Sequence, residues 1–194
     1  MSDYYDPHPR LRLSKAVVLG GQIGCGAPAI GRNVASRTGL SFSEVDRVIE
    51  HEAGMSLARL VFEDGLERLE MRAELVLSRL VHQSPRGIIV LDRAWIPETA
   101  RDLLRRQCHF VHVRRPMEYL VERFDAERRR SGDWIFEGSP EAARAAGDPG
   151  SVFDRREPRL RESRIVLEAG DQHANRVADL LLESFEQVSG AETL

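Results

Sequence analysis

The residues whose types and spacing best suggest chemistry lie in a glycine-rich segment near the N-terminus. This segment, GQIGCGAPAIG at residues 21–31, follows the apolar run at residues 16–19. Gly21, Gly24 and Gly26 match the loop half of the pattern G-x-x-x-x-G-K-S/T, in which backbone N–H groups and a helix N-terminus face a phosphate. The spacing predicts a phosphate-binding loop between a strand and a helix. An ordinary glycine-rich turn is the alternative.

The second half of the segment departs from that pattern. Ala27 stands where the pattern has lysine, and Pro28 stands where it has serine or threonine. The ammonium that contacts the transferred phosphate and the hydroxyl that holds Mg²⁺ are therefore missing, and proline lacks an N–H group. ATP and Mg²⁺ are disfavoured as cofactors, and Lys15 is the single lysine of the chain. A weaker anion site remains, built on the N–H groups of Gly24, Cys25, Gly26, Ala27 and Ala29.

Four further side chains, one aspartate, one cysteine and two histidines, are candidates for chemistry. Asp92 follows an apolar run and precedes Arg93, as a metal-binding aspartate at a strand end would, although an ordinary capping aspartate fits equally well. Cys25 at a helix N-terminus could have a lowered pKa, but no base is identifiable near it. His109 and His112 are three residues apart on a predicted strand, so they face opposite sides and cannot share a metal. No metal site is predicted.

The elements that must position these residues alternate between strand and helix. Apolar runs predict strands at 16–19, 41–42, 87–91, 108–113 and 164–168, and helical spacing predicts helices at 28–38, 45–52, 56–81, 97–106, 116–130 and 174–185. This order predicts an α/β fold of three layers, with a five-stranded parallel sheet covered by helices on both faces. Residues 15–188 form one domain, residues 131–154 are expected to be a mobile lid, and residues 1–14 and 189–194 are tails.

Composition limits the classes of partner. The 194 residues carry a net charge of −3, which argues against a general nucleic-acid or membrane-surface binder. No apolar run is long enough to span a bilayer, no signal sequence is evident, and two cysteines suit a reducing compartment. We therefore expect a cytoplasmic protein with a small-molecule ligand, and leave a protein partner or a homodimer open.

Several phrases of the sequence resemble shikimate kinases. Residues 46–57, DRVIEHEAGMSL, are similar to the family's aspartate, I-E and T-G-M-S-I wording, and residues 62–74, FEDGLERLEMRAE, resemble its F-x-x-x-G-E-x-x-F-R-x-x-E stretch. Residues 156–160, REPRL, resemble R-x-P-L-Y more weakly. The likeness covers most of residues 15–187. It implies the P-loop kinase topology with a lid.

The resemblance also implies roles for individual residues. Asp46 matches the carboxylate that binds the acceptor hydroxyls, and Glu44 replaces an acid that lies near the metal. Arg156 matches the arginine that binds the substrate carboxylate. Arg123 and Arg130 match lid-side arginines that contact adenine or phosphates.

Other positions depart from the family. A second carboxylate-binding arginine aligns with Glu70, although a shift of one residue could bring Arg72 nearer. The family's triple-glycine loop aligns with Arg93, Ala94 and Trp95. Glu70 would repel a carboxylate and Trp95 would fill space, so shikimate is disfavoured as the ligand and the pocket that includes Arg93 is expected to be altered.

Three functions are compatible with this combination of residues that match the family and residues that depart from it. The favoured one is a kinase-fold protein that binds a small anionic metabolite or nucleotide without ordinary ATP-dependent transfer. The second is a phosphotransferase with an unusual loop, in which Arg32, Arg93 or Arg130 supplies the charge. The third uses the former acceptor pocket for different acid/base chemistry, with Asp46, Glu44 or Asp92 as catalytic groups. Whether the protein is an enzyme stays open at this point.

Overall fold

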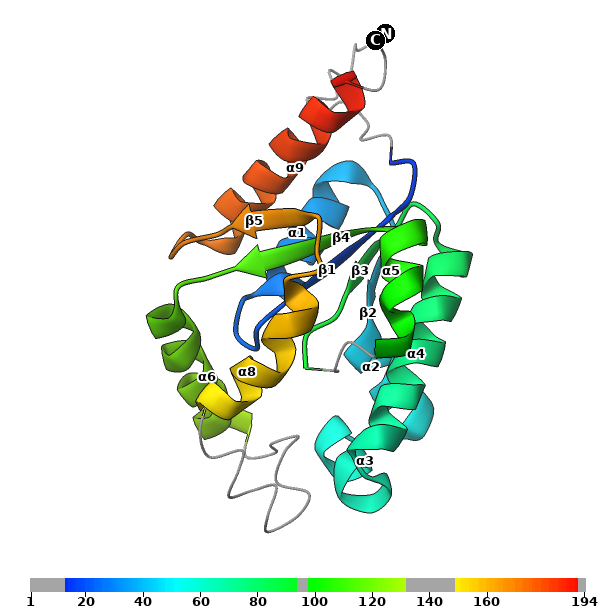
Figure 1. The fold of residues 1–194 in the computed structure, drawn as a ribbon, viewed down its shortest axis with the longest axis vertical. Helices are drawn as coiled ribbons and strands as arrows, with labels where there is room; N and C mark the ends of the chain where they lie inside the picture. Colours follow the sequence, from blue (N-terminus) through cyan, green and yellow to red (C-terminus); the bar gives the residue numbers. More distant parts are fainter. Residues whose placement is uncertain (1–12, 94–97, 132–148, 192–194) are drawn as a thin grey trace, which may run out of the picture.

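The computed structural model describes residues 13–93, 98–131 and 149–191. Five parallel strands form one sheet in the order β2-β3-β1-β4-β5 (Figure 1). The strands are β1 (Ala16–Gly21), β2 (Phe42–Glu44), β3 (Ile88–Val90), β4 (Cys108–Arg114) and β5 (Ile165–Glu168). In the centre of the sheet, Leu19 is in register with Val90 on one side and Val111 on the other. The predicted five-stranded parallel sheet is confirmed.

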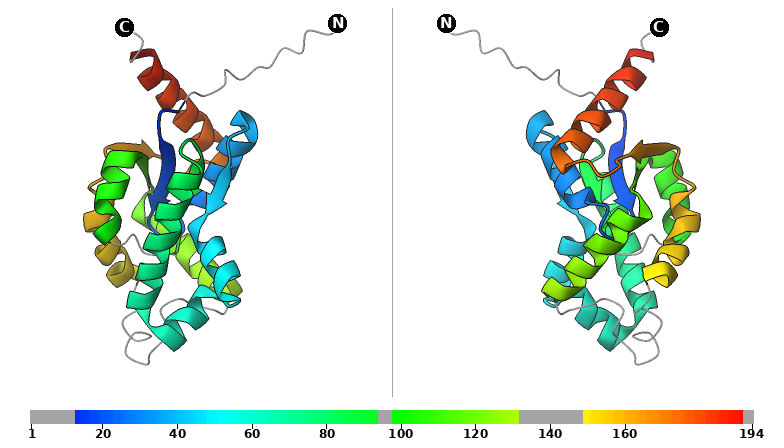
Figure 2. Two further views of the ribbon diagram at one scale, coloured as in Figure 1. Left: turned by 90° about the vertical axis from the view of Figure 1, so that its right-hand side faces the viewer. Right: turned by 90° about the vertical axis from the view of Figure 1, so that its left-hand side faces the viewer.

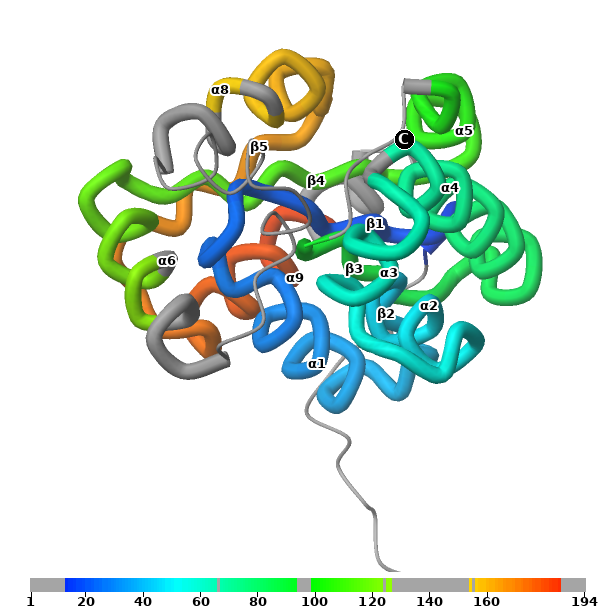
Figure 3. Tube along the Cα trace, turned by 90° about the horizontal axis from the view of Figure 1, so that it is seen from below, coloured from blue at the N-terminus to red at the C-terminus, as the bar shows by residue number. Residues whose placement is uncertain are grey.

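Helices cover both faces of this sheet. Helices α1 (Ala27–Thr38) and α9 (Ala174–Ala191) lie on one face, and α4 (Leu66–Gln83), α5 (Arg101–Gln107) and α8 (Pro149–Leu160) lie on the other (Figures 2 and 3). All six residues of β1 are buried, because the central strand has a helix layer above and below it. The three-layer architecture predicted from the alternating pattern is therefore confirmed.

The remaining helices lie around the carboxyl edge of the sheet and beside α4. They are α2 (Val45–Ala53), α3 (Leu57–Asp64), the 3₁₀ turn η1 (Glu98–Ala100) and α6 (Met117–Ser131). Helix α3 packs against the lower end of α4 in Figure 1. No helix in the described part of the chain is both long and apolar enough to cross a membrane.

The structure corrects three predicted elements. The helix expected over 56–81 is two helices that meet at Gly65, whose φ of 83° and ψ of 166° are nearly exclusive to glycine. Of the expected lid, residues 149–154 belong to α8, which begins at Pro149, and residues 132–148 lie outside the described residues. The helix expected over 97–106 is the short turn η1 followed by α5.

Candidate functional site

The glycine-rich loop connects the central strand β1 to α1, as predicted. Gly24 and Gly26 have φ angles of 87° and 85°, a left-handed conformation that glycine adopts without strain. Gly26 is the N-cap of α1 and, as a glycine, makes no side-chain capping hydrogen bond. A side chain at Gly21 would lie 2.7 Å from the carbonyl oxygen of Val113, so glycine is also required by packing there. The loop therefore presents the N-terminus of α1 with a glycine as its cap, and the Cys25 sulfur is hydrogen-bonded to the backbone N–H of Ala27.

Helix α1 opens with Ala27, which is buried, and Pro28, which is partly buried. Neither residue offers a cation or a hydroxyl. Lys15 does not compensate, because its Nζ donates to the carbonyl oxygen of Arg106 at 2.7 Å. It lies before the amino end of β1, and a strand of six residues places it about 20 Å from the loop. No lysine therefore serves this loop.

Arg115 lies directly against the loop, a position that the sequence reasoning missed. Its Nε donates to the carbonyl oxygen of Cys25 at 3.1 Å, and its Nη1 donates to three carbonyl oxygens of the turn after β5. These acceptors are Ala169 at 3.2 Å, Gly170 at 3.0 Å and Gln172 at 2.7 Å. The guanidinium carbon also lies 4.6 Å from the centre of the Tyr119 ring. The signal in the sequence was a pair of arginines that ends a buried strand.

Asp46 belongs to a group of charged residues at the start of α2. It is buried, and its Oδ2 accepts a hydrogen bond from the backbone N–H of Arg93 at 2.8 Å. The same oxygen lies 3.4 Å from Arg93 Nε, and Arg93 Nη2 lies 3.3 Å from Glu50 Oε1. Burial opposes the charge on Arg93, but the carboxylates of Asp46 and Glu50, and that of Asp92, outweigh it and raise the pKa of the guanidinium. We call Asp46, Glu50 and Arg93 the acidic–arginine cluster.

Arg156 joins this cluster to the loop. Its Nη1 donates to the carbonyl oxygens of Gly21 at 3.3 Å and Asp92 at 2.5 Å, and its Nη2 donates to that of Arg93 at 2.5 Å. Burial lowers the pKa of Arg156, an effect that nearby Asp92 and Asp46 oppose. The fold thus brings together Asp46, Asp92, Arg93 and Arg156. The role of Arg156 toward a substrate carboxylate stays a prediction, and the structure adds a role in holding the main chain.

Two other predicted acidic residues have charged neighbours outside this cluster. Glu44 forms an ion pair with Arg32 at 2.5 Å, and Arg32 also lies over the Phe42 ring. Glu70 is partly buried on α4; burial raises its pKa, Arg159 opposes the shift and Glu67 adds to it.

Two of the arginines that were expected near the ligand are exposed in the structure. Arg72 is exposed and lies 3.4 Å from Asp64, and Arg123 is exposed with its guanidinium 5.8 Å from the Tyr119 ring centre. Trp95 and the side chain of Arg130 lie outside the described residues.

The surroundings of Cys25 and of the two strand histidines indicate a role in packing. Cys25 is completely buried, and burial with the nearby Asp92 raises its pKa to about 12, which argues against a nucleophilic thiol. His109 packs against Phe185 of α9, whereas His112 lies near Glu157 of α8 on the opposite face. The prediction that these histidines face opposite sides is confirmed. Within the described residues, no cluster of three or more potential metal ligands occurs.

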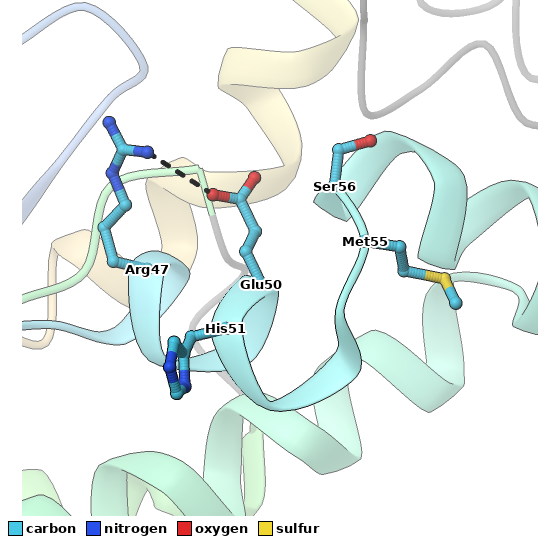
Figure 4. Close-up of a pocket in the computed structure, with 5 residues that line it drawn as sticks. All are labelled: Arg47, Glu50, His51, Met55 and Ser56. Atoms are coloured by element: carbon cyan, nitrogen blue, oxygen red, sulfur yellow. Dashed lines mark ion pairs between the residues drawn. The ribbon is translucent and has the colours of Figure 1, made fainter.

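A pocket of about 540 Å³ lies beside the acidic–arginine cluster, where α2 passes into α3. Its lining comprises Arg47, Glu50, His51, Met55 and Ser56. Figure 4 shows Arg47 and Glu50 pointing to the same side of α2, where their charged atoms lie 3.9 Å apart, and His51 on another side of the helix. Glu50 also accepts from the backbone N–H of Leu57 at 3.2 Å, so one carboxylate links this pocket, Arg93 and the start of α3.

A five-stranded parallel sheet with a glycine-rich loop leading from its central strand into a covering helix defines a P-loop kinase fold. The family model described as shikimate kinase matches residues 23–186. The chain belongs to the shikimate kinase family.

Individual relatives agree with this assignment. A shikimate kinase of Zymomonas mobilis is 29% identical over 124 residues, which is 64% of this chain and 68% of the relative. A shikimate kinase of Caulobacter vibrioides is 24% identical over 178 residues, covering 90% and 84% of the two chains. The structure of shikimate kinase from Acinetobacter baumannii in complex with shikimate has a TM-score of 0.74 at 19% identity, covering 89% of this chain and 93% of that one. That structural likeness supports the fold.

Proposed function

We propose that this member of the shikimate kinase family binds a small anionic metabolite or a nucleotide in a repurposed pocket and does not carry out ordinary ATP-dependent phosphorylation of shikimate. The observation that carries the proposal is the start of α1 at Ala27 and Pro28. A loop with this backbone still offers N–H donors to an anion, but it lacks the ammonium and the Mg²⁺-binding hydroxyl that phosphoryl transfer uses. Anion binding is therefore retained while transfer is disfavoured.

The acceptor side supports the same conclusion. Asp46, which the resemblance assigns to the acceptor hydroxyls, already accepts from the N–H of Arg93 and forms an ion pair with its guanidinium. A buried carboxylate in that position is less available to a substrate hydroxyl, because its Oδ2 already has hydrogen-bonding and ionic partners. Glu70, which the resemblance aligns with a carboxylate-binding arginine, would repel a carboxylate ligand at that position.

The pocket beside α2 is the proposed place for the non-phosphate part of the ligand. Arg47, Glu50 and His51 offer it one cation, one anion and one imidazole ring. Met55 adds an adaptable apolar surface. This lining favours a small polar molecule that carries charge.

Two measurements test the proposal directly. Calorimetric titration with Mg²⁺–ATP, ADP and AMP measures nucleotide binding, and a coupled assay with ATP and shikimate measures transfer. We expect no shikimate-dependent ADP formation above a protein-free control. ADP formation that depends on shikimate and disappears in Asp46→Asn would refute the proposal and favour a phosphotransferase with an unusual loop.

A gain-of-function variant tests the physical reason. Ala27→Lys combined with Pro28→Ser restores the cation and the hydroxyl, so we expect tighter Mg²⁺–ATP binding than in the wild type.

A thermal-shift screen of anionic metabolites then tests where the second part of the ligand binds. We expect its effect to fall in Arg47→Ala and to persist in Arg59→Ala, a matched exposed arginine on α3 that pairs with Glu63. Equal effects in both arginine variants would exclude the α2 pocket as the ligand site.

A further inference from the structure

One guanidinium reaches the phosphate loop from the end of β4. A Cβ atom built on Gly26 would lie 3.8 Å from Nη2 of Arg115. Gly26 is the N-cap of the twelve-residue helix α1, so Nη2 lies near the start of a helix whose first N–H groups have no partner within the helix itself. A positive group and a helix N-terminus therefore meet at one place.

Arg115 is buried and has no anionic partner among the described residues. Only 6% of its surface is exposed, and its hydrogen bonds all go to backbone carbonyl oxygens. Among the residues that the structure describes, no carboxylate forms an ion pair with Arg115, and none accepts a hydrogen bond from Nη2. Buried charges are normally paired, because an uncompensated charge is costly in a low-dielectric interior. Within the described part of the chain, this arrangement leaves Nη2 as a buried cationic donor that an anion can meet.

The rest of the guanidinium is firmly oriented. Its Nε and Nη1 bind the carbonyl oxygens of Cys25 and of the turn after β5, and its face lies against the Tyr119 ring. These contacts hold the group against the loop and leave Nη2 as its remaining donor. A donor that is oriented in advance loses little freedom when a ligand binds.

We infer that Arg115 supplies the phosphate loop with the positive charge that Ala27 does not, and that the ligand of this site is a phosphate group held between Nη2 and the N–H groups at the start of α1. The inference rests on the proposed function, since it names the cation of the same anion site. Several diverging donors match the oxygens of a phosphate, which accept charge-assisted hydrogen bonds in several directions. The site binds the anion and transfers nothing.

The test uses the full chain with inorganic phosphate, pyrophosphate and AMP as probes in calorimetry. Removal of a charged donor predicts at least tenfold weaker binding of pyrophosphate in Arg115→Gln. We expect Arg115→Lys to bind with intermediate affinity, because it keeps the charge and loses the planar fork. Arg114→Gln is the matched control, since Arg114 is exposed and pairs with Glu168, and its affinity should stay within twofold of the wild type. Tighter binding of AMP than of phosphate would identify a phosphate ester as the ligand; equal binding would identify the free anion.

A second measurement, on the wild-type chain, tests the inference even if the glutamine variant fails to fold. Protein labelled with ¹⁵N-arginine is titrated with phosphate, and the guanidinium resonance that Arg115→Lys removes should shift. Phosphate binding that leaves this resonance and the affinity of Arg115→Lys unchanged would overturn the inference while the proposed function stands. A wild type that binds no phosphate probe but is stabilised by an unphosphorylated anion would also overturn the inference alone. Shikimate phosphorylation by the wild type would overturn the proposed function instead.

Discussion

Replacement of Arg156 with methionine tests whether this arginine holds the site together. The change keeps a long side chain on α8 and removes the guanidinium that binds the carbonyl oxygens of Gly21, Asp92 and Arg93. Those three carbonyls lie on the loop and just after β3, so the variant loses three bonds between α8 and these segments, while the bond from Gln22 to Glu157 remains. We therefore expect this one substitution to lower the unfolding free energy by a large amount.

The magnitude follows from the three bonds and the burial. A hydrogen bond to a charged group contributes about 1.5–3 kcal/mol, so three of them give about 5–9 kcal/mol. Keeping a guanidinium buried costs several kcal/mol of desolvation, which the variant no longer bears, so we expect a net loss of about 3–5 kcal/mol. For a domain of this size that corresponds to a Tm lower by about 6–20 °C.

Urea denaturation followed by circular dichroism, with calorimetric Tm values beside it, measures the effect. Arg161→Met is the matched control just after the end of α8, because Arg161 is 76% exposed in its side chain and pairs only with Glu157 among the described residues. That variant should change the unfolding free energy by less than about 0.5 kcal/mol. A loss below about 1 kcal/mol in Arg156→Met, with an unchanged m-value, would refute the view that the buried guanidinium holds the loop in place.

Three further predictions address the backbone, a histidine and the thiols. Gly65→Ala should lower the unfolding free energy by about 1–3 kcal/mol in urea denaturation, because the angles at Gly65 suit only glycine, whereas Gly39→Asn at a left-handed cap should change it by less than about 0.5 kcal/mol; equal effects would contradict this. Burial lowers the pKa of His112 below the 6.5 of an unfolded chain, so the unfolded state binds more protons and stability should fall as the pH drops below 6.5, with a smaller fall in His112→Gln; parallel pH profiles would contradict the assignment. Burial raises the pKa of Cys25 to about 12 and that of Cys108 to about 11, so iodoacetamide at pH 8 should leave both unmodified until guanidinium chloride is added, and rapid alkylation of the native protein would be evidence against the buried setting.

Local sequence patterns were sufficient to predict the architecture of the sheet and the position of the glycine-rich loop. Apolar runs that alternate with helical spacing predicted five parallel strands, since a strand buried on both faces is apolar throughout. The glycines of the loop were predicted from spacing over six residues, and Gly24 and Gly26 do adopt the left-handed angles that glycine allows. The break at Gly65 was missed because the apolar stripe continues through it with little change of period.

The sequence by itself determined the fold and the missing lysine and hydroxyl, because both depend on which residues stand next to one another in the chain. Only the tertiary structure decided what surrounds the loop. Arg115 contacts Cys25 across 90 positions of sequence, and Arg156 contacts Gly21 across 135. Contacts at such separations arise when packed helices and strands bring distant segments together, and no local period records them. A buried arginine that follows β4 therefore lies against the glycine-rich loop, and this contact is visible only in three dimensions.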